Sequence, residues 1–282
     1  MQNKQGNQKY GEYLQVIKEC SPYDFSQYSN NSIDRRIEKI MHDNDLNMDQ
    51  LIYRTRTSEE FVEFVVEEIT VNTTELFRDP LLWKYLHHEV WPSFKNKANI
   101  NIWHAGCSTG QEVYSNMILL DDLGLLNQCN IYASDISRNA ISKAKKGEYE
   151  CSFNIEKYYD NFTQVFEEDK HHLFEKYFVV NEKEDLFKVN ESFVKKIKFM
   201  THDLVKQEFP VSIKFDIIFC RNVLIYFNER LQTEIVQRFH NRLLPEGLLV
   251  LGAHELLDGF FRTKFTRTNQ VYRKNNSFHF KY

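Results

Sequence analysis

Short runs rich in β-branched and aromatic residues alternate with helical stretches from about residue 100 onward, and this alternation constrains the fold more than any other feature. Strands that alternate with helices are typical of a parallel α/β sheet with helices on its faces. Five strands are expected, at residues 100–104, 130–134, 196–200, 215–220 and 248–251. A closing hairpin is expected over residues 264–268 and 270–274.

The N-terminal part of the chain has a different pattern. Apolar residues recur at helical spacing through residues 24–68, with no strand-like alternation. We therefore predict a helical domain with its linker over residues 1–80 and an α/β domain over residues 81–282. Asp79 is expected to cap the next helix, with Pro80 at its first position.

Residues 148–194 interrupt the strand–helix alternation. This stretch is long, is rich in Phe, Tyr, Lys and Glu, and contains a candidate strand at residues 177–181. We predict that it forms an inserted subdomain that mixes helix with short strands.

Composition excludes several classes of protein. No apolar run approaches the roughly 18 residues that span a membrane, and residues 1–8 lack the apolar core of a secretory signal. Five cysteines without a C-x-x-C spacing are typical of reduced thiols, so we expect a cytoplasmic protein without membrane insertion. The net charge of −4 argues against a broad nucleic-acid surface but allows a local basic patch. The histidines lack ligand spacing, so no metal site is expected, and the pair His87-His88 is expected at the surface.

A glycine-containing turn lies between the first predicted strand and the helix that follows. Gly106 and Gly110 would let the backbone approach a ligand, and the free N–H groups of a helix start suit an anionic group. The turn is neither G-x-G-x-x-G nor a P-loop, which removes the main support for those two classes of site. Taken alone, a tight turn that binds nothing explains this segment equally well.

Polar residues also follow two other predicted strands. Asp135 ends the second strand, where a carboxylate can accept both hydroxyls of a ribose, although a helix cap is the simpler explanation of Asp135 alone. Together with the glycine turn, it favours an adenosine-type ligand. Arg221 follows a buried strand, where it requires either a structural ion pair or an anionic ligand, and Tyr226 lies in the apolar turn beyond it.

The order and spacing of five segments can be compared with those of known families. These segments are residues 72–79, 105–115, 134–136, 219–227 and 252–255. Together with Arg35-Arg36-Ile37 in the helical region, they resemble the CheR-type chemotaxis-receptor methyltransferases. The resemblance extends from about residue 24 to residue 274.

This resemblance implies an S-adenosylmethionine-dependent O-methyltransferase that methylates glutamate side chains of chemoreceptor-like proteins. It also implies a fold: an N-terminal all-helical domain, a Rossmann-like methyltransferase domain whose last strand is antiparallel, and a small inserted β-subdomain. The expected partner is the cytoplasmic domain of a chemoreceptor or a related helical signalling protein.

The resemblance also assigns residues. Those expected at the cofactor are Asn72, Thr74, Arg78, Gly106, Glu112, Asp135, Asp203, Leu204, Arg221 and Asn222. Within this set, Glu112 and Asp135 should hold the methionine and ribose ends, and Asp203 stands where the family usually has an asparagine near the adenine. His104 departs from the family, which usually has a small polar residue at that position.

The reaction itself suggests further roles. A glutamate side chain is already an anionic nucleophile at neutral pH, so catalysis should come mainly from positioning and desolvation. Arg78, Arg221 and Tyr226 are the candidates to orient the substrate carboxylate. Arg35, Arg36 and Lys39 are the candidates to bind an acidic helical receptor, against the alternative of a solvated face balanced by neighbouring acids, Asp34 and Glu38.

Two other functions remain open. A nucleic-acid methyltransferase would usually carry an Asn-Pro-Pro-Tyr, Asp-Pro-Pro-Tyr or Pro-Cys motif, and the sequence has none of these. A scaffold that binds the cofactor without turnover would keep the same cofactor residues, so the sequence does not separate it from an enzyme.

Overall fold

The computed structural model describes residues 9–71, 73–150, 155–166, 171–206, 209 and 212–275. Its centre is a seven-stranded sheet with the order β6-β2-β1-β7-β8-β10-β9. The strands are β1 (Ile100–Ala105), β2 (Cys129–Asp135), β6 (Ile197–Thr201), β7 (Phe215–Cys220), β8 (Leu243–Leu251), β9 (Phe265–Thr268) and β10 (Val271–Lys274). The pairs from β6 to β8 are parallel, whereas β10 runs antiparallel to both β8 and β9, which confirms the predicted α/β fold with its antiparallel last strand.

The predicted strands are confirmed within one or two residues, except for the start of β8. That strand begins at Leu243, five residues before the predicted start. Phe215 pairs with Leu243 whereas Ile217 pairs with Leu248, so residues 244–247 form an irregularity within the strand. The Pro-Glu-Gly sequence of residues 245–247 therefore lies in a bulge inside a longer pairing.

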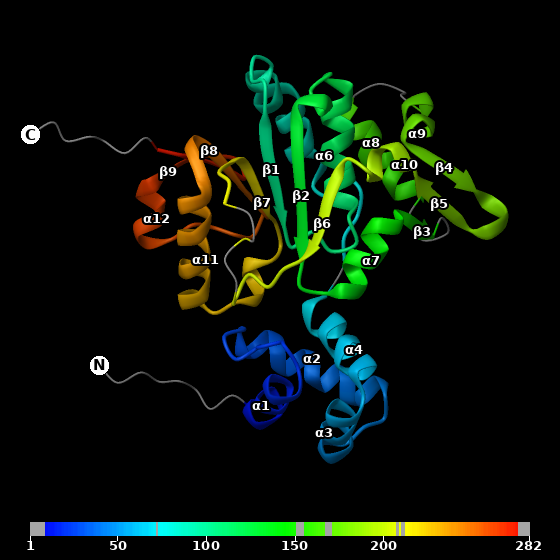
Figure 1. The fold of residues 1–282 in the computed structure, drawn as a ribbon, viewed down its shortest axis with the longest axis vertical. Coiled ribbons are helices and arrows are strands. Elements are labelled where there is room, and N and C mark those ends of the chain that lie inside the picture. The colour runs from blue at the N-terminus through cyan, green and yellow to red at the C-terminus, as the bar shows by residue number, and fades with distance from the viewer. Residues whose placement is uncertain are drawn as a thin grey trace, which may run out of the picture.

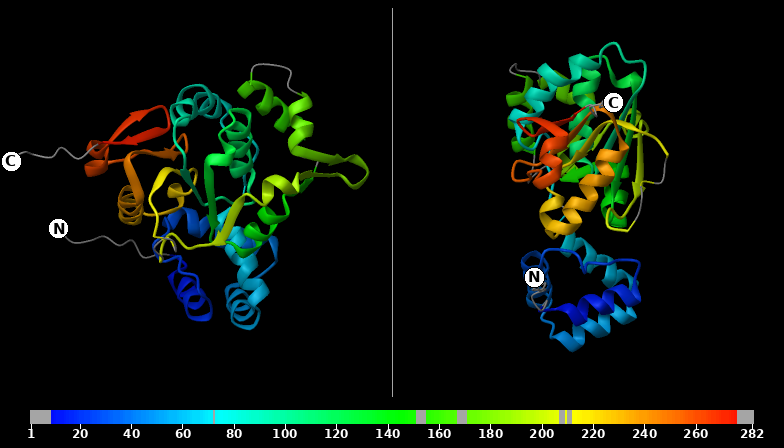
Figure 2. Two further views of the ribbon diagram at one scale, coloured as in Figure 1. Left: turned by 45° about the horizontal axis from the view of Figure 1, so that its top comes forward. Right: turned by 90° about the vertical axis from the view of Figure 1, so that its left-hand side faces the viewer.

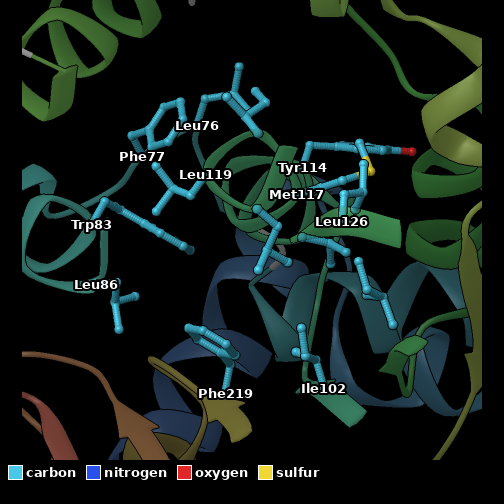
Figure 3. Packing of buried hydrophobic residues seen from close by; sticks show 14 of the residues in the cluster. Leu76, Phe77, Trp83, Leu86, Ile102, Tyr114, Met117, Leu119, Leu126 and Phe219 are labelled. Carbon is cyan, nitrogen blue, oxygen red and sulfur yellow. The ribbon is translucent and has the colours of Figure 1, made fainter. Parts of the chain in front are cut away.

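Helices cover both faces of the sheet because the buried strands alternate their side chains between two cores. In β7, Ile217 and Phe219 face one core, and Ile218 and Cys220 face the other. The first core is closed by α5 (Pro80–Tyr85), α6 (Gln111–Asp122) and α8 (Ile155–Phe166), and the second by α11 (Glu229–Arg242) and α12 (Gly259–Lys264). On the first side, Trp83 of α5 stacks on Phe219 with 6.0 Å between ring centroids (Figure 3).

Four helices form the N-terminal region: α1 (Gly11–Cys20), α2 (Asn30–Asp43), α3 (Met48–Thr57) and α4 (Glu59–Thr70). Reciprocal hydrogen bonds between Asn47 and Gln50 cap α3, and the Ser58 side chain caps α4. The arrowheads of the parallel strands point towards these helices, which lie beyond the end of the sheet (Figures 1 and 2). Among the described residues, no helix has the length and apolar character required to cross a bilayer.

A small antiparallel sheet is inserted between β2 and β6 and projects from the side of the larger sheet (Figure 2). It contains β3 (Glu148–Glu150), β4 (Phe178–Asn181) and β5 (Leu186–Val189) in the order β3-β5-β4. Further helices of this insertion are α9 (His171–Tyr177), α10 (Glu191–Val194) and the short η4 (Glu182–Glu184). Elsewhere in the chain, α7 (Arg138–Lys146) packs against β2 and β6, and short helical segments occur at η1 (Leu86–Val90), η2 (Trp91–Phe94), η3 (Leu126–Gln128) and η5 (Leu224–Tyr226). The inserted β-subdomain is confirmed.

Two local predictions need correction. Pro80 is the first residue of α5 and Asp79 takes the cap position, but the Asp79 side chain makes no capping hydrogen bond because it is paired with Arg221 instead. His87 is buried rather than at the surface, since its Nε2 lies 2.8 Å from Oδ2 of Asp122.

Candidate functional site

A cavity of ≈ 200 Å³ lies at the carboxyl ends of β1, β2 and β7, against the N-terminal helical region. Many of the residues predicted for the cofactor or for catalysis line it, namely Thr74, Arg78, Gly106, Glu112, Asp135, Asp203, Leu204, Arg221, Asn222 and Tyr226. Asn72 lies outside the described residues. Segments that are far apart in the sequence therefore meet at one cavity.

The glycine turn forms one wall of the cavity. Gly106 has a φ of +81°, and a Cβ at this position would collide with the Val223 side chain. The backbone N–H groups of Gly106 and Cys107 donate to the carbonyl oxygen of Ser134 at 2.8 and 2.9 Å. These bonds hold the turn against β2, beside the carboxylate of Asp135.

Asp135 is buried at the end of β2, and backbone groups orient its carboxylate. Oδ2 accepts a hydrogen bond from the N–H of Ser108 at 2.8 Å, and Oδ1 accepts one from the N–H of Ser137 at 3.0 Å. Burial raises the pKa of Asp135, and these backbone donors partly oppose that rise. Each carboxylate oxygen can accept more than one hydrogen bond, so the group can still accept from ligand hydroxyls. The cap of α7 is Ser137, so Asp135 does not serve as its cap.

Arg221 joins three segments of the site. Its Nη1 lies 3.1 Å from Oε2 of Glu112, and its Nη2 lies 2.7 Å from Oδ2 of Asp79 and 2.9 Å from the carbonyl oxygen of Arg78. The side chain is only 2% exposed. A buried arginine requires such partners, and the structure supplies them from the protein itself.

Glu112 is held in its ionised form by two neighbours. Its Oε1 lies 2.9 Å from Nδ1 of His104, and its Oε2 pairs with Arg221. Burial raises the pKa of Glu112, but the hydrogen bond from His104 and the charge of Arg221 outweigh burial and leave this pKa below its usual range. The site thus combines a fixed negative charge with a fixed positive charge near the first turn of α6.

Glu255 shapes the loop that follows β7, a role that sequence reasoning did not assign. Its carboxylate accepts hydrogen bonds from the backbone N–H groups of Gly252, Asn222, Val223 and Ile225, at 2.7 to 3.3 Å. Asn222 has a φ of +59°, a conformation that needs such support. Glu255 therefore holds the loop segment that carries Asn222 and precedes Tyr226.

Asp203 follows β6 and also lines the cavity. Its Oδ1 accepts a hydrogen bond from the N–H of Val205 at 2.8 Å, and its buried Oδ2 has no hydrogen-bond partner among the described residues. Burial raises the pKa of Asp203. An unpaired buried acceptor at a cavity wall is suited to a ligand that donates a hydrogen bond.

The basic residues of α2 lie near the end of the site that carries Tyr226. Burial raises the pKa of Tyr226, and the positive charges of Arg36, Arg78 and Arg35 oppose that rise. Arg36 and Lys39 also line a neighbouring cavity of ≈ 270 Å³.

The three basic residues differ in their partners. Lys39 forms ion pairs with Asp43 at 2.8 Å and Glu68 at 3.1 Å. Arg35 and Arg36 form no ion pair with any described residue. Two of the three predicted substrate-binding residues thus lack an ion-pair partner in the part of the chain that the structure describes.

Comparisons with known proteins agree with this site. The family described as "CheR methyltransferase, SAM binding domain" matches residues 72–273. Cher3 from Pseudomonas putida, a protein named as a methyltransferase, is 34% identical over 84% of this chain and 84% of its own length. Chemotaxis protein methyltransferase 1 of Pseudomonas aeruginosa is 32% identical over 80% of this chain and 82% of its own. The chemotaxis protein methyltransferase of Borreliella burgdorferi is 30% identical over 75% and 73%.

The matched region begins in the loop before α5 and ends in β10, so it contains β1, β2, β7 and the loops that surround the cavity. Most of the polar residues that line the cavity lie within this matched region. The chain belongs to the CheR methyltransferase family and carries its S-adenosylmethionine-binding domain.

Proposed function

We propose that this protein transfers a methyl group from S-adenosylmethionine to glutamate side chains of a chemoreceptor-like signalling protein in the cytoplasm. The observation that carries the proposal is the placement of Arg35 and Arg36, which have no ion-pair partner among the described residues, near Tyr226 of the cofactor cavity. An acidic helical partner bound along α2 would bring its carboxylates close to the methyl-transfer position. Relatives named as chemotaxis protein methyltransferases support the substrate class.

The chemistry of the cavity fits the cofactor. Asp135 presents a carboxylate to ribose hydroxyls, and the unpaired Oδ2 of Asp203 suits the amino group of an adenine. Glu112 suits the ammonium group of the methionine end. The bound cofactor would supply an activated methyl group on a positively charged sulfur.

Arg78 and Tyr226 are the residues that we assign to the substrate carboxylate. The guanidinium of Arg78 makes one long hydrogen bond, 3.4 Å to the carbonyl oxygen of Thr73, which leaves other donors available. An orienting contact suffices, because strong neutralisation would lower the nucleophilicity of the carboxylate.

We assign Arg221 a different role from the one expected from sequence. Its two terminal nitrogens are already bound to Glu112, Asp79 and the backbone of Arg78. We therefore propose that Arg221 organises the cofactor end and the Arg78 loop rather than binding the substrate.

Two measurements test the function. Isothermal titration with S-adenosylhomocysteine should show binding, and radiolabelled methyl transfer should be seen with cytoplasmic fragments of chemoreceptors. Binding without transfer to any receptor fragment would favour a scaffold, and transfer to DNA or RNA alone would favour a nucleic-acid methyltransferase.

A further inference from the structure

Tyr28 belongs to the N-terminal helical region, yet it lines the cofactor cavity. It lies in the segment between α1 and α2, outside the region that matches the family description. Its side chain is only 5% exposed, and its hydroxyl makes no hydrogen bond to any described residue. Because this hydroxyl oxygen is not among the fully buried polar atoms, a ligand in the cavity that Tyr28 lines can reach it and accept a hydrogen bond from it.

The backbone fixes Tyr28 in this position. Residues 27–29 pair with residues 226–228 as a short antiparallel bridge, with Tyr28 opposite Phe227. The N–H of Ser29 donates to the carbonyl oxygen of Tyr226 at 2.8 Å, and the N–H of Asn228 donates to that of Gln27 at 3.0 Å. The N-terminal region is thereby joined to the loop that carries Tyr226.

Aromatic neighbours restrain the ring as well. The Tyr28 ring meets Phe227 edge to face, with 4.9 Å between centroids, and meets Phe25 in the same manner at 4.9 Å. Such contacts hold a side chain before a ligand arrives, which reduces the entropy lost on binding.

The surroundings of the hydroxyl indicate which end of the ligand it meets. Burial raises the pKa of Tyr28, and the negative charges of Asp203 and Asp135 raise it further, so the hydroxyl stays protonated and can donate. Ionised Asp135 and Asp203 can only accept hydrogen bonds. An adenosine group has both hydrogen-bond donors and acceptors. The two carboxylates can bind its donors, and the Tyr28 hydroxyl can donate to one of its acceptors.

We propose that Tyr28 is a cofactor-binding residue, and that its hydroxyl donates a hydrogen bond to the adenosine half of S-adenosylmethionine. This inference rests on the cofactor cavity and is independent of the receptor as substrate. It makes the N-terminal region part of the cofactor site.

The test compares Tyr28→Phe with the parent protein by isothermal titration, using S-adenosylhomocysteine and 5′-methylthioadenosine, which lacks the amino-acid end. Tyr28→Phe keeps the ring and its packing but removes the donor. We expect the dissociation constants for both compounds to rise by a similar factor of about 3 to 10. An unchanged affinity for S-adenosylhomocysteine would overturn the proposal. A loss confined to S-adenosylhomocysteine would also overturn it, because the contact would then lie at the methionine end.

Tyr13→Phe provides the matched control. Tyr13 is a buried tyrosine of the same helical region whose hydroxyl is bonded to Thr55 at 2.9 Å, and it does not line the cavity. Its substitution should lower the melting temperature without changing either dissociation constant. If Tyr13→Phe weakens binding as much as Tyr28→Phe does, the effect is a general loss of stability and the proposal fails. Because receptor methylation is not measured, failure of the proposed substrate would leave this result unaffected.

Discussion

Arg221 Nη1 lies 3.1 Å from Oε2 of Glu112, joining the end of β7 to the first turn of α6. Neither side chain is more than 13% exposed. The pair therefore has a dual consequence: it fixes the polar end of the cofactor cavity, and it ties the stability of the fold to the ionisation of Glu112.

The first prediction concerns this ionisation. The pKa of Glu112 lies below its unfolded value of 4.5, so its contribution to stability is complete above pH 4.5 and is lost as the pH falls towards the lower folded value. Glu112→Gln should reduce the free energy of unfolding by about 1–3 kcal/mol at pH 7, and this difference from the parent should shrink below pH 4.5. Urea unfolding at several pH values measures it. Glu60→Gln, at an exposed position of α4, should show neither effect, and a pH-independent loss in Glu112→Gln would contradict the prediction.

The second prediction assigns Asp135 to the cofactor. Asp135→Ala should weaken S-adenosylhomocysteine binding by about 1–3 kcal/mol, because hydrogen bonds to a charged group are lost. Isothermal titration provides the measurement. Asp216→Asn is the control, since Asp216 is equally buried but bonds the N–H of Asn101 outside the cavity. Parent-like affinity in a folded Asp135→Ala protein would remove Asp135 from the site.

Third, Tyr226→Phe should reduce turnover more than it reduces thermal stability. The tyrosine lines the cavity, and its ring can remain packed when the hydroxyl is removed. We expect turnover to fall about tenfold, the equivalent of about 1.4 kcal/mol in the barrier, with S-adenosylhomocysteine affinity little changed. Tyr53→Phe, at an exposed position on α3, serves as the control. If Tyr226→Phe transfers methyl groups at the same rate as the parent protein, the Tyr226 hydroxyl has no part in the reaction.

Arg78 is the subject of the fourth prediction. Arg78→Ala should lower turnover more than the melting temperature, because its guanidinium makes only one long hydrogen bond to the residues that the structure describes. Arg78→Lys should restore part of the rate, since an ammonium keeps the charge but not the planar donor pair. Steady-state kinetics of both variants measure these effects. Equal rates for Arg78→Ala and the parent would exclude the assigned role.

The fifth prediction concerns the receptor. Reversing Arg35 and Arg36 to Glu should raise the KM for a receptor fragment at low ionic strength, because encounter with an acidic helix is then no longer favoured by charge. The affinity for S-adenosylhomocysteine should not change. The same reversal of Arg54 and Arg56 on α3 alters the net charge equally and is the control. A KM that is equal for the Arg35/Arg36 variant and the parent would assign these residues to the solvated surface and leave recognition to the inserted subdomain.

Sequence reasoning succeeded where local patterns determine structure. The buried strands, the glycine turn and the position of Asp135 could be predicted because alternation and glycine placement act over a few residues. The predicted start of β8 is wrong because Leu243 already pairs with Phe215, before the irregularity at residues 244–247 that separates it from the apolar run.

Contacts between residues that are far apart in the sequence could not be predicted. The sequence left open whether Arg221 meets a protein acid or a ligand, and Asp79 was predicted to cap a helix. The structure pairs these two residues, which are more than a hundred positions apart. No local pattern indicates the role of Tyr28, because its position depends on backbone pairing with residue 227, which is far away in the sequence.

The bridge between residues 27–29 and 226–228 also bears on how such proteins can be recombined. Receptor preference could be altered by exchanging the N-terminal helices between relatives. However, these helices are not an independent module. A chimera joined in the linker before α5 would combine a Tyr28 segment from one parent with a Phe227 segment from the other. Productive chimeras should therefore carry both segments from the same parent, even though the two segments are far apart in the sequence.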